Sequence, residues 1–172
     1  MKKLLLLMAV ICAGIVVMHK VDPVHQEVLG ATLLGAKEDA DDAYDEAQTA
    51  YSAMAQAFSN ANSKYAEAIS EKNAALGRGA TQAQIDSIMN THMADGDDDW
   101  TRAEVHEEDG DQFDADGWDE YNVLNYAIAE GKWKTYIWPS GNAKFEYQEA
   151  DKDYDAAYAD YDDAVQDFQA LP

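Results

Sequence analysis

The side chains best suited to chemistry in this chain are carboxylates gathered near its middle. Thirteen Asp and Glu residues lie between Asp95 and Glu120, where Arg102 is the single Lys or Arg. Carboxylate oxygens are preferred Ca²⁺ ligands, but an EF-hand counted from Asp95 has Trp100 at the glycine position and His106 at the final glutamate position. A calcium site in another kind of loop would use the following four carboxylates: Asp109, Asp111, Asp114 and Asp116. The alternative is a solvated acidic surface.

Other catalytic or metal-binding patterns are missing from the sequence. His92 and His106 are far apart and lack cysteine partners, which is not the ligand spacing of zinc sites, so both are expected at the surface. The chain contains no nucleophile elbow and no phosphate-binding glycine loop. Carboxylates are so abundant that a glycosidase-like pair would arise by chance. We therefore expect a protein that is not an enzyme, has no small-molecule substrate and has only Ca²⁺ as a candidate cofactor.

Charge and cysteine content exclude two further classes of protein. The 172 residues carry 12 Lys and Arg against 34 Asp and Glu, a formal net charge of −22. A polyanion of this density repels phosphate backbones, so nucleic acid is excluded as a partner. The single cysteine, Cys12, rules out an intramolecular disulfide framework. Helix packing must therefore supply the stability.

Residues 1–20 form a predicted hydrophobic signal-anchor segment. Lys2 and Lys3 precede an apolar run over residues 4–18, which spans about 22 Å as a helix. No small-x-small cleavage site follows the run, which favours a retained membrane anchor, while the alternative is secretion after cleavage. The flanking lysines place the amino end in the cytoplasm and the acidic region outside it, in the periplasm or on a cell or virion surface.

Two stretches of heptad repeat flank the middle of the chain, in residues 21–76 and residues 147–172. Aromatic residues recur every seven positions, mostly with alanine three places later, a pattern typical of packed helices. Because both stripes have the same period and four heptads each, we expect a mainly α fold with a long antiparallel, coiled-coil-like helix pair, or packing against other copies of the chain. Their phenol oxygens should reach water or Asp side chains. The predicted interaction seam comprises Tyr44, Tyr51, Met54, Phe58, Tyr65, Tyr147, Tyr154, Tyr161 and Phe168.

Residues 77–146 are predicted to form a small, mostly helical acidic head inserted between the two heptad helices. Gly77–Gly79 should end the first long helix, and Thr81 should cap a short one. Further helices are expected to start at Thr101 and at Asp116. The predicted surface of the head carries the four tryptophans Trp100, Trp118, Trp133 and Trp138.

Together these features predict a membrane-anchored or exported structural and interaction protein. It would space and present its acidic head to a protein partner, or to copies of itself, in an envelope, appendage or virion assembly. The alternative is a calcium-responsive binding module whose head becomes ordered when Ca²⁺ binds.

Overall fold

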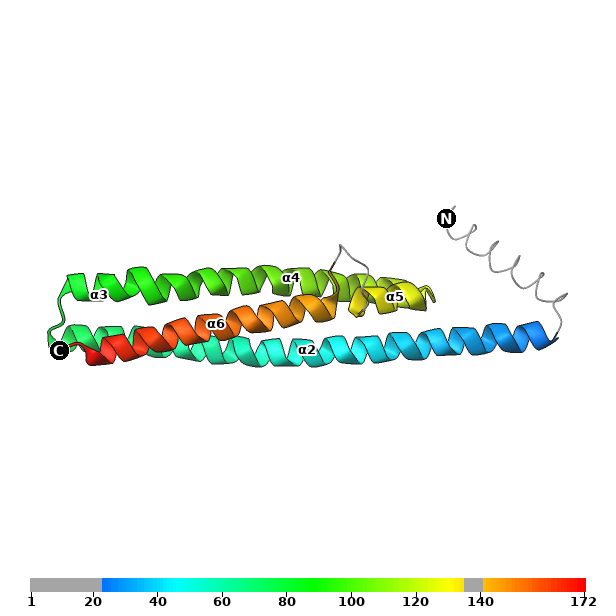
Figure 1. Cartoon of the computed structure of the whole chain (residues 1–172), viewed down its shortest axis with the longest axis horizontal. Helices are drawn as coiled ribbons and strands as arrows, with labels where there is room; N and C mark the ends of the chain where they lie inside the picture. The colour runs from blue at the N-terminus through cyan, green and yellow to red at the C-terminus, as the bar shows by residue number, and fades with distance from the viewer. Residues whose placement is uncertain (1–22, 135–140) are drawn as a thin grey trace.

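The computed structural model describes residues 23–134 and 141–172, and all regular structure in these ranges is helical, which confirms the mainly α prediction (Figure 1). Residues 4–18 and Trp138 lie outside the described ranges. Among the helices within them, none is both long and apolar enough to cross a membrane. The elements are α2 (Pro23–Arg78), α3 (Gln82–Ile88), the π-helix η1 (Met89–Met93), α4 (Ala94–Asn122), α5 (Tyr126–Trp133) and α6 (Ala143–Ala170).

The ends of the first helices follow the sequence signals. Helix α2 starts at Pro23 and ends at Arg78, and Gly79 takes the left-handed φ of 105° that favours glycine. Thr81 caps α3 through a reciprocal box with Gln84: the Gln84 backbone N–H donates to Thr81 Oγ1 at 3.3 Å, and the Thr81 N–H donates to Gln84 Oε1 at 2.9 Å. Both predicted boundaries are confirmed.

Helix α4 contradicts the two helix starts predicted at Thr101 and Asp116. It is continuous from Ala94 to Asn122, and the Thr101 hydroxyl donates back to the Asp97 carbonyl at 2.9 Å instead of capping a new helix. Its glycines, which would weaken an isolated helix, lie where bulky side chains of other helices approach. Tertiary packing therefore keeps α4 helical through positions that locally favour a break.

The two heptad helices run parallel, so the predicted antiparallel arrangement is wrong. Three aromatic residues of α2 each contact a ring of α6, and each successive pair lies seven residues further along both helices. The ring centroids are 5.2 Å apart for Tyr51–Tyr147, 5.3 Å for Phe58–Tyr154 and 5.2 Å for Tyr65–Tyr161. A seven-residue period fixes which face of a helix is buried but carries no information about direction.

The segment predicted as a head returns along the bundle instead. Helix α4 runs antiparallel to α6, because Gly96 lies against Tyr161 while Gly110 lies against Tyr147. Helices α2, α4 and α6 therefore form a three-helix, up–down–up rod (Figure 1). A full-length return helix takes the place of the compact head, since α4 offers small residues along the whole length of the α6 ring stripe.

Helix α5 continues the line of α6. Trp133 of α5 lies against Gly117 of α4 and has its ring centroid 5.1 Å from that of Tyr44, just as Tyr147 lies against Gly110 and Tyr51. The residues that contact these two rings are seven positions apart on α2 and seven apart on α4. Trp133 and Tyr147 themselves are fourteen positions apart. The third line of the bundle thus contains an insertion of one heptad between α5 and α6.

The carboxyl terminus lies at the end of the rod where α2 finishes. Arg78 Nη2 donates to the Phe168 carbonyl at 2.7 Å, and its Nε lies 3.3 Å from the carbonyls of Leu171 and Pro172. The start of α2 and the carboxyl terminus are therefore at opposite ends (Figure 1). This arrangement overturns the expectation, implied by an antiparallel pair, that the chain returns toward its amino-terminal segment.

Candidate interaction site

The rings predicted to form one seam divide into two classes in the structure. Those of α6 are buried, with exposed fractions of 0–1% for Tyr147, Tyr154, Tyr161 and Phe168. Those of α2 are about half-buried: Tyr51 is 40% exposed, and Phe58 and Tyr65 are each 39% exposed. Met54 is buried, and Tyr44 is partly buried. The α2 rings are thus available at the surface in a way that the α6 rings are not.

The alanines of α2 explain why its rings lie at an edge. Ala43, Ala47, Ala50, Ala57 and Ala61 are buried, and they let α2 pack closely against α6. The ring positions lie beside this alanine face.

On that side the α2 rings meet tryptophans of α4. The ring centroids are 4.9 Å apart for Tyr44 and Trp118 and 5.0 Å apart for Phe58 and Trp100. Partly exposed rings of α2 and α4 therefore line the side where these two helices face each other. We call this row of rings the aromatic groove: it consists of Tyr51, Phe58 and Tyr65 of α2 with Trp100 and Trp118 of α4, and a cleft lies at its Tyr65 and Trp100 end.

The buried tyrosines, Tyr147, Tyr154 and Tyr161, bind carboxylates of α4. Their hydroxyls donate to Asp111 at 2.9 Å, Glu107 at 2.7 Å and Asp97 at 2.8 Å, respectively. The expectation that phenol oxygens reach acidic side chains is confirmed for Tyr147 and Tyr161, which bind Asp, and Tyr154 binds Glu. Burial, followed by the carboxylate contact, raises the pKa of all three phenols well above the usual value for tyrosine.

The tryptophans do not share one exposed surface as predicted. Trp133 is fully buried and donates from Nε1 to Asp114 Oδ1 at 2.9 Å, because Gly117 leaves room for its ring. Trp118 is 38% exposed, and Trp100 is partly buried. Only these two of the described tryptophans contribute to the surface.

The four carboxylates proposed as calcium ligands are not brought together. At 100° per residue on α4, Asp109 and Asp116 lie on one side of the helix and Asp111 and Asp114 on the other. Asp114 receives the Trp133 indole, and burial raises its pKa, whereas Lys132, 2.7 Å from Asp116, lowers the pKa of that carboxyl. In the described ranges no group of His, Cys, Asp and Glu side chains could hold a metal ion.

His92 and His106 are partly buried and pair with carboxylates of α6. His106 Nδ1 lies 2.8 Å from Oε2 of the buried Glu146, and His92 Nε2 lies 3.4 Å from Asp167 Oδ2. These contacts link α4 and η1 to α6.

One feature of the fold escaped the sequence-based predictions although its signal was present. Gly96, Ala103, Gly110 and Gly117 form a heptad of small residues on α4, and all four are buried. Read as a heptad, this stripe would have indicated a third long helix facing the α6 rings.

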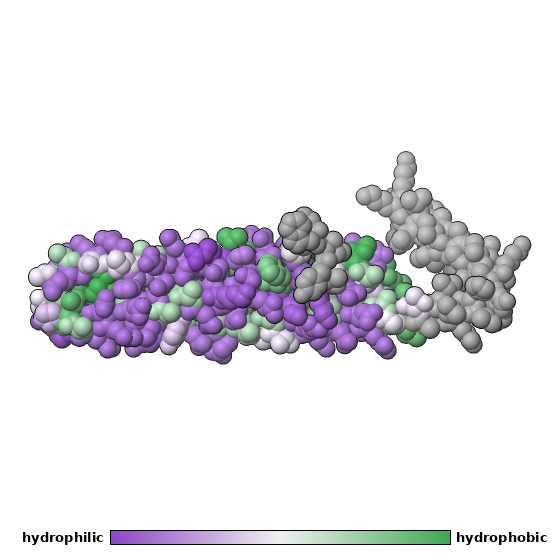
Figure 2. All heavy atoms as spheres, in the orientation of Figure 1, coloured by the Kyte–Doolittle hydropathy of each residue, from purple (hydrophilic) through white to green (hydrophobic). Residues whose placement is uncertain are grey.

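No protein-family model, no curated protein and no solved structure matches the chain. The candidate site is therefore described by its own chemistry. The visible face of the rod is largely hydrophilic, with small apolar areas interrupting it (Figure 2). Exposed aromatic rings within such a surface are the groups on which a partner could gain apolar contact.

Proposed function

We propose that the chain is a non-enzymatic structural and interaction protein that binds a protein partner, or a second copy of itself, along the aromatic groove. The observation that supports this most directly is the row of half-exposed rings on α2, spaced by seven residues, beside Trp100 and Trp118 of α4. Aromatic side chains dominate the energetics of protein interfaces when a partner covers them.

The charge of the chain indicates the kind of partner. With a net charge of −22, the protein would attract proteins with basic surfaces and repel proteins with acidic ones. A row of exposed rings along a rod also suits an elongated partner such as an amphipathic helix, whose anchors recur every three or four residues. A basic helical segment is therefore the partner that the groove favours.

The rod would also set a distance. Helix α2 has 56 residues and is about 84 Å long at 1.5 Å per residue. If residues 4–18 hold the chain in a membrane, the α2–α3 turn and the carboxyl terminus form the remote end, outside the cytoplasm. The protein would then act as a spacer in an envelope, appendage or virion assembly, and cleavage of the amino-terminal segment would instead release it.

Site-specific photocrosslinking tests the binding role. The full chain, expressed in its native cells, would carry p-benzoylphenylalanine in place of Phe58 in the groove, or in place of Tyr158 as a control. Tyr158 is similarly exposed, at 37%, but its ring lies beside Lys64 instead of in the groove.

We expect an adduct of defined mass from position 58 and none from position 158. An adduct of twice the chain mass would identify a second copy, and any other mass a different protein. The purified partner should then bind the wild-type chain and lose affinity when Phe58→Ala is introduced. Absence of adducts at position 58, or equal adducts at both positions, would refute a groove-directed binding role.

Vesicle flotation tests the anchor separately. The full chain should float with vesicles of phosphatidylcholine in high salt, whereas a chain lacking residues 1–20 should remain at the bottom of the gradient. Flotation of both forms, or of neither, would contradict anchoring through residues 4–18.

A further inference from the structure

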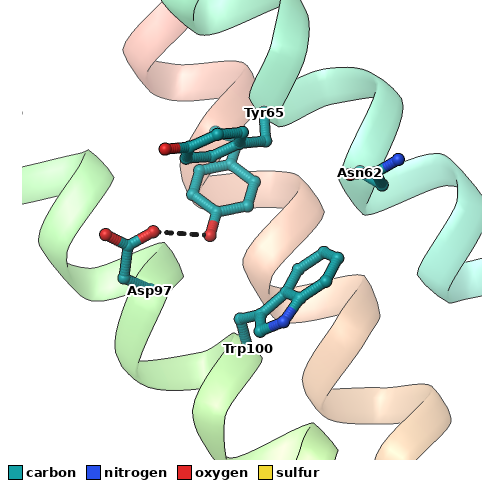
Figure 3. Close-up of a pocket in the computed structure, with 5 residues that line it drawn as sticks. Asn62, Tyr65, Asp97 and Trp100 are labelled. Atoms are coloured by element: carbon teal, nitrogen blue, oxygen red, sulfur yellow. Dashed lines mark hydrogen bonds between the residues drawn. The ribbon is translucent and has the colours of Figure 1, made fainter.

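A cleft lies at the Trp100 end of the aromatic groove. Its volume is about 200 Å³, and its lining comes from three helices. Figure 3 shows Asp97 of α4 on the side of Tyr65, with the indole of Trp100 lying between Asp97 and Asn62 of α2. With Tyr161 of α6 completing the lining, three of the five residues are aromatic, one is a carboxylate and none is basic.

Hydrogen bonds make the aromatic walls attractive to a cation. Tyr161 donates its hydroxyl to Asp97 Oδ1 at 2.8 Å, and Trp100 donates from Nε1 to Glu104 Oε1 at 2.9 Å. Donation to a carboxylate polarises the ring system and increases electron density on its faces. Indole and phenol faces bind ammonium groups best when the cation lies within about 6 Å of the ring centroid.

The nearby cations of the chain are engaged elsewhere. Lys64, the sequence neighbour of Tyr65, pairs with Glu67 at 2.7 Å and with Asp162 at 2.9 Å. Arg102, two residues after Trp100, pairs with Asp99. Within the described ranges no Lys or Arg is paired with Asp97, so the negative charge in the cleft has no internal counter-ion.

We propose that this cleft binds the ammonium group of a lysine side chain carried by a protein partner. The ammonium meets Asp97, and the four-carbon stem packs against the rings of Tyr65 and Trp100. The inference rests on the proposed function for the partner and names the group that the groove recognises.

The cleft can be tested without a partner protein. The probe is the peptide acetyl-Gly-Lys-Gly-amide, titrated into the full chain in an uncharged detergent at about 150 mM salt, where exposed charges are largely screened beyond about 8 Å. Peptides carrying acetyl-lysine or norleucine in place of lysine remove the charge while keeping the stem. The readout is the indole N–H resonance of Trp100, assigned by its loss in Trp100→Phe.

Two matched variants separate the cleft from the overall negative charge. Asp97→Asn removes the carboxylate charge and keeps an oxygen that can accept the Tyr161 hydroxyl. Asp111→Asn removes the same charge from the equivalent bond to Tyr147, one that lies outside the cleft. Circular dichroism of each variant confirms that it is folded.

We expect a saturable shift of the Trp100 resonance with the lysine peptide, at least threefold weaker binding in Asp97→Asn, and unchanged binding in Asp111→Asn. Acetyl-lysine and norleucine peptides should leave the resonance in place. An unresponsive Trp100, equal responses to the charged and neutral peptides, or equal weakening in both variants would overturn the proposal.

The lysine titration and the crosslinking experiment can fail independently of each other. Crosslinking at position 58 together with a failed lysine titration would remove only the cleft. Lysine binding without crosslinking would leave the cleft in place and refute the binding role of the groove.

Discussion

Replacing Gly110 by alanine tests whether the glycines of α4 exist to admit the α6 rings. A Cβ atom at this position would lie 2.5 Å from Cε1 and 2.7 Å from Cδ1 of Tyr147. That ring is 1% exposed, its hydroxyl is held by Asp111, and its face meets the edge-on ring of Tyr51, so it has little room to move. Overpacking of this kind costs about 1–3 kcal/mol.

Helix propensity acts in the opposite direction. Alanine stabilises a helix interior by about 0.5–1 kcal/mol relative to glycine. The net expectation for Gly110→Ala is therefore a loss of about 0–2.5 kcal/mol, or a Tm lower by about 0–10 °C for a chain of this size. Thermal and urea unfolding of the full chain in an uncharged detergent, followed by circular dichroism, would measure the change.

Gly77→Ala is the matched control. Gly77 lies in the last turn of α2 with no atom within 4 Å of its would-be Cβ, so the same substitution should raise the stability there. The natural chain contains a third comparison, because Ala103 takes the place of a glycine in the same heptad, at the level of Tyr154. There the phenol is held differently: the Tyr154 hydroxyl binds Glu107, four residues after Ala103, whereas the Tyr147 hydroxyl binds Asp111, the residue directly after Gly110. If Gly110→Ala were as stabilising as Gly77→Ala, the packing explanation of the glycine stripe would be wrong.

Four further outcomes follow from the same structure. Alkaline pH should unfold the rod cooperatively: the folded-state pKa of the buried tyrosines is raised, so their contribution to stability is complete below a pH of about 10 and is lost as the pH rises toward their folded pKa. Ionisation of the full set of ten tyrosines, read from the absorbance at 295 nm, before circular dichroism is lost would contradict the prediction. Tyr154→Phe should cost about 1.5–3 kcal/mol in urea unfolding, since it removes a hydrogen bond to the charged Glu107, and an unchanged midpoint would count against that bond. Spin labels on Ser52 and Gln148 should be closer together than labels on Ser52 and Gln169, because Gln169 lies on the order of 30 Å further along the rod axis. Antiparallel helices would reverse this order of distances. Raising the salt from about 0.05 to 0.5 M should raise the Tm, because repulsion among 34 acids outweighs attraction to 12 bases, and a falling Tm would show that ion pairs dominate.

The sequence predicts the local structure of this protein better than its topology. The end of α2 at Gly79 and the cap at Thr81 depend on neighbouring residues alone, so both were predictable. The helix start expected at Thr101 failed because the same side-chain chemistry also allows a hydroxyl to bond back within a continuing helix. The direction of α6 relative to α2 was beyond reach, since it depends on where the intervening residues pack.

The candidate site shows the same limit. Heptad spacing predicts that Tyr51, Phe58 and Tyr65 recur on one side of a helix, and they do. It does not predict that alanines beside them take the buried position against α6 and leave the rings half-exposed. The pairing of Trp100 with Phe58 depends on α4 returning along the rod, which the small-residue heptad of α4 indicates but the prediction of a compact head overlooked.

Uncharged hydrogen-bond donors allow the acidic helices of the rod to pack together. Where α4 packs against α5 and α6, phenol and indole groups donate to Asp97, Glu107, Asp111 and Asp114, so these carboxylates are satisfied without cations. A hydrogen bond to a carboxylate compensates for its partial desolvation and leaves its negative charge in place. Two acidic helices can therefore pack together while the surface potential remains strongly negative. The groove beside them is accordingly a place where a positively charged partner would gain both ring contact and charge neutralisation, each of which the rod itself leaves incomplete.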